Sequence, residues 1–125
     1  MTPEQWKEFD PYFTPNECGE GMSYSFMEKF LLFRLDVNLP VIVHSGCEPD
    51  GHASMGYHPR GEAIDFHIPG MSMREALRLL DKHGFGGVGA YHWWSSPGFH
   101  ADFRPISRYQ RWVSLKKGEY IYLIQ

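Results

Sequence analysis

The stretch Gly56-Tyr-His58-Pro-Arg-Gly-Glu-Ala-Ile-Asp65 decides how this chain is organised. It sets a histidine and an aspartate seven positions apart, a spacing that does not place them on one helical turn. Towards its end, apolar residues alternate with small or charged ones, which is typical of a strand with one face on a core. Gly61 gives the backbone freedom to bend between the two ends. We therefore expect His58 in a loop that enters a strand, and Asp65 on that strand.

A second histidine-led cluster, Gly98-Phe-His100-Ala-Asp102, follows after a gap long enough for one helix and one strand. Catalytic zinc sites take three protein ligands from histidine and carboxylate side chains and keep a fourth position for water. His58, Asp65 and His100 supply such a set. The sequence therefore predicts that these three residues bind a metal ion.

The segment from His58 to Asp65 resembles the His-x-x-Gly-x-Ala-x-Asp signature of the zinc D-alanyl-D-alanine carboxypeptidase family, which has relatives among phage endolysins and Hedgehog signalling domains. Further segments match in the family's order across a core of about residues 38–112. They are the strand that ends in Ser45-Gly46, the turn at 68–70, the glycine-rich strand at 86–91 and the closing segment at 99–102.

The resemblance implies an α+β fold, with a mainly antiparallel sheet flanked by helices and a zinc ion on one sheet face. It also implies a zinc metallopeptidase that hydrolyses amide bonds in bacterial peptidoglycan, as an endopeptidase or a carboxypeptidase acting on a stem peptide or a cross-link. His58, Asp65 and His100 are the implied Zn²⁺ ligands. Zinc lowers the pKa of a bound water from 15.7 towards about 7, which makes hydroxide available near neutrality.

The catalytic base is not at the family's usual place. Many members carry an acid three residues before the last histidine ligand, where this chain has Pro97. Asp102 is the first candidate, because it lies two residues after His100. Residues two apart on a strand face the same side, so the Asp102 carboxylate would lie near His100 and the metal. Asp102 equally fits a role in orienting the imidazole of His100. His92 is the second candidate, as acid, base or oxyanion stabiliser, and the alternative is a loop histidine without a role.

The substrate-binding residues also depart from the family pattern. Members often follow the Ser-Gly with an apolar residue and an arginine that holds a peptide carboxylate, whereas this chain has Cys47 and Glu48 there. Arg60 and Arg104 are the candidates to replace that arginine, and surface charge is the alternative for both. The aromatic segment that starts at Tyr91 is a candidate cleft wall, with core or interface packing as the alternative.

Composition narrows the classes of function. The chain has 125 residues, 42% of them hydrophobic and 16% aromatic, which predicts a single domain over 1–125. A net charge of −3 gives no basic surface for nucleic acid or an anionic membrane. We find neither a signal peptide nor an apolar stretch of membrane-spanning length. We therefore expect no membrane insertion, and a protein that is cytoplasmic when made and is released by lysis or carried by a virion.

Spacing and turn residues predict the elements. Thr2 caps a short first helix, a second helix spans 23–36, and a third begins at Ser72 and ends near 83–84. The second helix is expected to bury Phe26, Phe30, Leu31, Phe33 and Leu35. Strands are expected at 39–44 (buried), around Asp65, at 85–91, at 98–103 and at 119–124, with loops at 11–19 and 46–57.

Two points stay open from the sequence. Cys18 and Cys47 fit either one disulfide or two reduced thiols. The function has an alternative from another class, which is a catalytically silent metal-binding domain that acts as a phage or cell-wall binding component. Pro97, at the place of the usual acid, favours that alternative.

Overall fold

Six strands form one sheet, and the helices lie on one side of it in the computed structural model, which describes residues 1–48 and 56–123. The strand order is β1-β2-β4-β3-β5-β6. The helices are α1 (Pro3–Lys7), α2 (Pro15–Cys18), α3 (Tyr24–Val37) and α4 (Met73–Lys82), with a 3₁₀ turn at Ile106–Arg108. The strands are β1 (Ile42–Ser45), β2 (Ala63–His67), β3 (Gly87–Tyr91), β4 (Gly98–Asp102), β5 (Gln110–Lys116) and β6 (Glu119–Tyr122).

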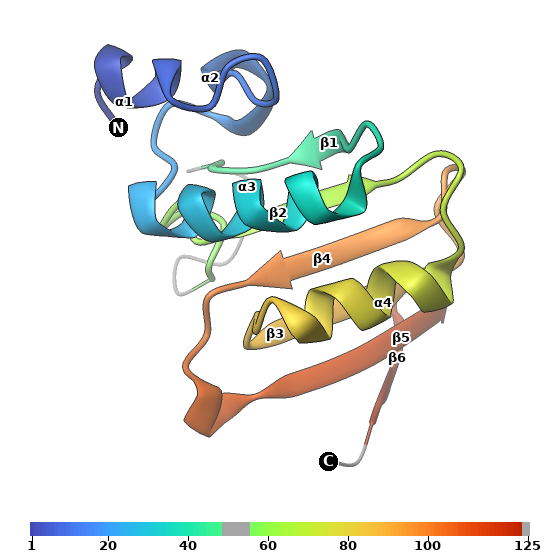
Figure 1. Ribbon diagram of the computed structural model, residues 1–125. Coiled ribbons are helices and arrows are strands. Elements are labelled where there is room, and N and C mark those ends of the chain that lie inside the picture. Colours follow the sequence, from blue (N-terminus) through green and yellow to red (C-terminus); the bar gives the residue numbers. More distant parts are fainter. Residues whose placement is uncertain (49–55, 124–125) are drawn as a thin grey trace.

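The predicted α+β class with a mainly antiparallel sheet is confirmed. Every neighbouring pair of strands is antiparallel except β3 and β5, which run parallel. In Figure 1, α3 lies over β1 and β2, and α4 lies over β3 and β4. No helix in the described part of the chain is both long and apolar enough to cross a membrane.

The three predicted helices form, and each begins at a side-chain cap. Thr2 and Gln5 form the capping box of α1, and Ser23 and Ser72 cap α3 and α4 by accepting a backbone N–H three residues on. The last turn of α3 ends at Asn38, which adopts a left-handed conformation with φ of 55°. Local polar chemistry therefore fixes these helix starts as the sequence predicted.

Phenylalanine side chains fill the space between the helices and the sheet. Phe30 of α3 is fully buried and packs edge-on against Phe66 of β2 and Phe85, with ring centroids 5.1 and 6.2 Å apart. On β2, Ile64 and Phe66 point into this core, as the alternation predicted. The opposite face of β2 is therefore the one that presents Asp65.

Three details differ from the expectations. The first strand was expected to be buried, but β1 is an edge strand and Ile42 is 43% exposed. Leu35 is 46% exposed rather than buried, because it turns away from the sheet while Val37 fills the last core position of α3. The loop expected at 11–19 contains the short helix α2, which Thr14 caps.

Two expectations fall partly or wholly outside the described residues. Most of the expected loop at 46–57 and the last residue of the expected final strand, Ile124, lie outside the described ranges.

Cys18 and Cys47 are free thiols rather than a disulfide. Burial raises the pKa of the Cys18 thiol to about 12, which keeps it protonated.

Candidate metal centre

A tight turn places His58 at the start of β2. The N–H of Gly61 donates to the carbonyl of His58 at 3.0 Å, and the carbonyl of Gly61 accepts the N–H of Ser23 at 2.9 Å. Gly61 has φ of +70°, and a Cβ there would collide with the backbone of Gly21. Both the conformation and the close approach require glycine. The predicted bend is therefore present, and it anchors the His58 loop to the segment that precedes α3.

The other two residues come from neighbouring strands. Asp65 of β2 is directly paired with His100 of β4, so both side chains lie on the face away from α3 and α4. Their neighbours Phe66 and Phe99 point into the core. Residues that are 35 positions apart in the chain are thus brought side by side by strand pairing alone.

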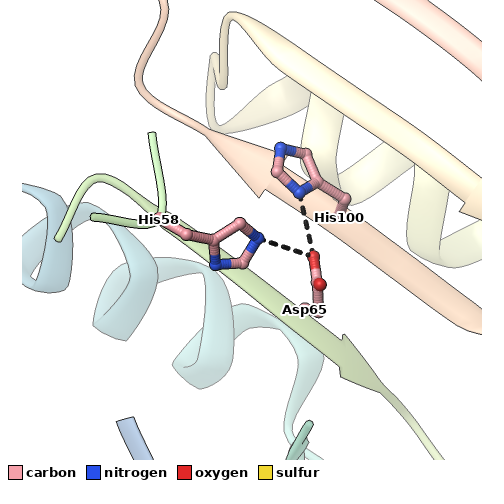
Figure 2. Close-up of side chains that lie close together, drawn as sticks. All are labelled: His58, Asp65 and His100. Carbon is pink, nitrogen blue, oxygen red and sulfur yellow. Dashed lines mark hydrogen bonds and ion pairs between the residues drawn. The ribbon is translucent and has the colours of Figure 1, made fainter. Parts of the chain in front are cut away.

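His58, Asp65 and His100 point towards one another (Figure 2). Asp65 Oδ1 lies 3.3 Å from His58 Nε2 and 2.9 Å from His100 Nδ1. Bond lengths of 2.0–2.2 Å in a tetrahedral site place neighbouring ligand atoms about 3.3 to 3.5 Å apart. Among residues 1–48 and 56–123, this is the one cluster of three such side chains whose ligand atoms all lie within 4.8 Å. The group can hold a metal ion.

The remaining ring nitrogens are already held by protein groups. His58 Nδ1 lies 2.8 Å from the carbonyl of Gly46 and donates to it. His100 Nε2 lies 2.7 Å from Asp102 Oδ2. Each bond fixes the orientation of an imidazole and turns its other nitrogen towards Asp65, as is usual for histidines that bind metals. The two remaining nitrogens face the same carboxylate oxygen, an arrangement that suits a shared metal ion.

Without a metal, the hydrogen bonds of His100 to two carboxylates favour its protonated form. Burial alone would lower the pKa of His100, but its hydrogen bonds to Asp102 and Asp65 raise it to about 9. Burial alone would raise the pKa of Asp65, but hydrogen bonds from His100 and His58 outweigh it and hold the pKa well below its usual range. His100 is therefore an imidazolium at neutral pH in the metal-free protein, and metal binding must displace one proton.

Asp102 is enclosed by its partners. Its side chain is fully buried, and Arg104 binds it through Nε at 2.9 Å, through Nη2 at 2.7 Å and through the backbone N–H at 3.0 Å. Burial would raise the pKa of Asp102, whereas the bonds from His100 and Arg104 lower it well below the usual range. Of the two roles that the sequence left open, this geometry fits orientation of His100, because a carboxylate with no exposed surface cannot reach a substrate proton.

The other predicted site residues differ in how far they are buried. Tyr91 ends β3, and its ring stacks on Trp94 with centroids 4.4 Å apart. His92 is exposed on the loop that follows, where its backbone N–H donates to Ser114. Arg60 is exposed, and its guanidinium lies 5.1 Å from the ring of Tyr57. The structure thus brings together the predicted metal ligands and Asp102, whereas His92 and Arg60 remain at the surface.

The aromatic segment that starts at Tyr91 forms a rim at the β1 edge together with His44, whose part in it the sequence did not indicate. Trp94 packs on Tyr91 and also on His44 of β1, with centroids 5.1 Å apart in the second pair. His44 Nε2 in turn lies 2.5 Å from Nδ1 of His67, which shares a strand face with Asp65. The loop between β3 and β4 therefore reaches across to the edge strand. Trp93 is 38% exposed and Trp94 is only partly buried, so these rings lie outside the core, and the cleft-wall role of Tyr91 to Trp94 stays a prediction.

The comparisons with known proteins leave the family resemblance untested. No protein-family model matches the chain, and no curated protein matches it significantly. We therefore infer the function from the geometry of the site and from the order of the motifs.

Proposed function

We propose that this chain is a zinc-dependent metallopeptidase that hydrolyses amide bonds in bacterial peptidoglycan peptides. The observation that carries the proposal is the cluster of His58, Asp65 and His100, whose ligand atoms all lie within 4.8 Å of one another. Two imidazoles and a carboxylate are the ligand set of hydrolytic zinc sites, which leave a fourth position for water. The same three residues are the ones that the resemblance to the carboxypeptidase family implies.

Zinc at this site supplies a polarising charge for the scissile carbonyl and a water of lowered pKa. The protein's own groups set the geometry. Gly46 and Asp102 orient the two imidazoles through their second nitrogens. Asp102 in turn is fixed by Arg104, so that the histidine ligand is braced by a buried ion pair. Ligands whose orientation is fixed by such hydrogen bonds bind metal more tightly than ligands that are free to rotate.

Proton transfer to the leaving amine requires a group that can reach the substrate. Asp102 is buried and is better suited to orient His100 than to act as the base. His92 keeps the predicted acid–base role, since it is exposed on the loop that borders the site. The aromatic rim of Tyr91 and Trp94 supplies a wall against which a peptide can lie.

The experiment is hydrolysis of soluble peptidoglycan stem peptides and cross-linked dimers by the zinc-loaded protein, followed by the release of new amino groups and by mass spectrometry. We expect turnover that is abolished by a chelator, restored by zinc and absent in His58→Ala. A matched control is His83→Ala, which removes a histidine that pairs with Asp36 away from the site and should leave turnover intact.

A second candidate function follows from the enclosure of Asp102 and from Pro97 at the place of the usual acid. In this alternative the chain is a catalytically silent domain that holds the metal to recognise the cell wall or to complete a phage structure. Binding of stem peptides without turnover between about pH 5 and pH 9 would favour this function and would contradict the peptidase.

A further inference from the structure

A row of directly paired residues crosses the whole sheet and links the metal ligands to a second pocket. Asp65 pairs with His100, His100 with Gly89, Gly89 with Trp112, and Trp112 with Tyr122. Directly paired residues point to the same sheet face. The metal ligands and the side chains of Trp112 and Tyr122 therefore share one surface.

Gly89 makes this surface continuous. It has no side chain, and a Cβ at its position would collide with the indole of Trp112. The indole instead lies over the strand and approaches the ring of His100, with centroids 5.4 Å apart. Neighbouring strands are about 4.8 Å apart, so β5 lies about 10 Å from the strand that carries His100. A peptide needs about three extended residues to span that distance.

Beyond the indole lies a pocket of about 190 Å³, lined by Tyr91, Arg104, Trp112, Tyr120 and Tyr122. None of these five side chains is acidic. Tyr91 Oη accepts the indole N–H of Trp112 at 3.0 Å, so its own hydrogen is available to donate. The pocket therefore combines phenol and guanidinium donors with aromatic walls, and none of its lining residues carries a carboxylate.

Arg104 is built to receive an anion. A guanidinium has five N–H donors. Nε and Nη2 bind Asp102, whereas Nη1 has no hydrogen bond to any residue in the described ranges. The group is held flat between contacts with Tyr57 and Trp112, whose ring centroids lie 5.4 and 5.1 Å from Cζ. Its side chain is 22% exposed, so a ligand can reach the unused edge.

We propose that this pocket binds a carboxylate carried by the peptide within about three residues of the scissile amide. Arg104 Nη1 and the hydroxyl of Tyr91, Tyr120 or Tyr122 are the donors. The pocket itself is independent of the peptidase activity, and the identity of the ligand as a peptide rests on the proposed function. Arg104 rather than Arg60 is thus the substitute for the arginine that the sequence lacks after Ser45-Gly46.

A cationic ligand fits this pocket less well, although aromatic walls often bind cations. The guanidinium of Arg104 already lies over Trp112 and would repel a second positive charge. A neutral sugar ring can stack on the tyrosines but would leave Nη1 without a charged acceptor. The combination of donors therefore favours a carboxylate over the other two classes.

The test uses N-acetylglycine as the probe and N-acetylglycinamide, which lacks the charge, as its matched control. Binding is followed by the NMR signal of the Trp112 indole N–H, which is identified by its loss in Trp112→Phe. Each titration is run on zinc-free and on zinc-loaded protein, because a carboxylate also binds zinc directly. We expect the carboxylate to shift the signal in both forms, with binding at least about tenfold tighter than that of the amide.

Three variants locate the site. Arg104→Lys keeps the positive charge but loses the planar set of guanidinium N–H donors, and it should weaken binding about tenfold. Because Asp102 depends on Arg104, a second variant, Tyr120→Phe with Tyr122→Phe, removes two exposed hydroxyls without touching that ion pair and should weaken binding severalfold. Arg60→Gln is the control and should leave binding unchanged.

Equal shifts with acid and amide, no shift with either probe, or a shift that requires zinc would each overturn the proposal. So would unchanged binding in both Arg104→Lys and the double tyrosine variant. The result is independent of turnover: carboxylate binding without hydrolysis retains the subsite and rejects the peptidase. Hydrolysis that does not distinguish acid from amide retains the peptidase and rejects the subsite. Peptides with the carboxylate at a side chain or at the C-terminus then identify its source.

Discussion

Replacement of Asp102 by asparagine separates the two roles that the sequence left open for this residue. Asparagine has nearly the same shape but offers one acceptor oxygen, whereas Asp102 serves both His100 and Arg104. Its amide nitrogen must face one of these two donors. An orienting carboxylate that is lost from a metal site lowers metal affinity by about 10- to 100-fold, which is about 1.4 to 2.8 kcal/mol.

The same substitution should also lower the stability of the metal-free protein. Hydrogen bonds to charged groups contribute about 1.5 to 3 kcal/mol each. Arg104 is partly exposed, and water can replace part of what it loses. We therefore expect a loss of about 1.5 to 2 kcal/mol in the free energy of unfolding, at the lower end of that range.

The assay is a competition titration of zinc between the protein and a chromogenic chelator, together with urea unfolding of the metal-free form. Asp36→Asn is the matched control, because Asp36 pairs with Lys82 and His83 at the surface. That variant should bind zinc like the wild type. Zinc affinity that is unchanged in Asp102→Asn while peptide turnover is lost would refute the orienting role and would assign Asp102 as the base.

Three further predictions concern protons, the sheet face and the core. His100 has a pKa of about 9 in the metal-free protein and an ordinary value of 6.5, so its contribution to stability is present below about pH 6.5 and is lost as the pH rises through about 9. Because metal must displace that proton, zinc affinity should rise about tenfold per pH unit up to pH 9, with one proton released in calorimetry. Gly89→Ala should cost about 1 to 3 kcal/mol in urea unfolding, because its Cβ collides with the Trp112 indole. Phe30→Ala should cost about 3 to 5 kcal/mol by the same assay, since Phe30 is fully buried among the core aromatics.

Local signals in the sequence were sufficient for most of the fold. Thr2, Ser23 and Ser72 mark helix starts because a side-chain oxygen before an apolar pattern satisfies backbone N–H groups that the helix leaves free. The alternation before Asp65 predicted which face of β2 meets the core. These features depend on neighbours within a few residues, so the sequence expresses them directly.

Features that depend on the pairing of segments far apart in the chain could not be predicted from the sequence. β1 is rich in β-branched residues, as a buried strand would be, yet the strand order places it at the sheet edge. The spacing of Phe26, Phe30 and Phe33 is helical, but it could not show that Leu35 turns outward while Val37 turns in. Sheet order and the rotation of a helix are set by which surfaces finally pack together.

In the candidate site too, one part was predicted from the sequence and another part depends on strand pairing. The histidine and aspartate ligands were visible because their residue types and spacing are those of a metal site. The pocket around Arg104 was not, since its aromatic walls come from β3, β5 and β6 and meet only after the strands pair. Gly89 is the residue that could have indicated the pocket. The structure pairs it with Trp112, and the indole leaves no room for a Cβ at this position.

The metal content of the purified protein shows whether the three predicted ligands bind zinc. It should be measured in the wild type and in His58→Ala, Asp65→Ala and His100→Ala after saturation with zinc and removal of the excess. We expect one tightly bound zinc per chain in the wild type, and loss of that zinc in each variant that stays folded. Wild-type protein that cannot be loaded, or three folded variants that all retain the metal, would contradict it.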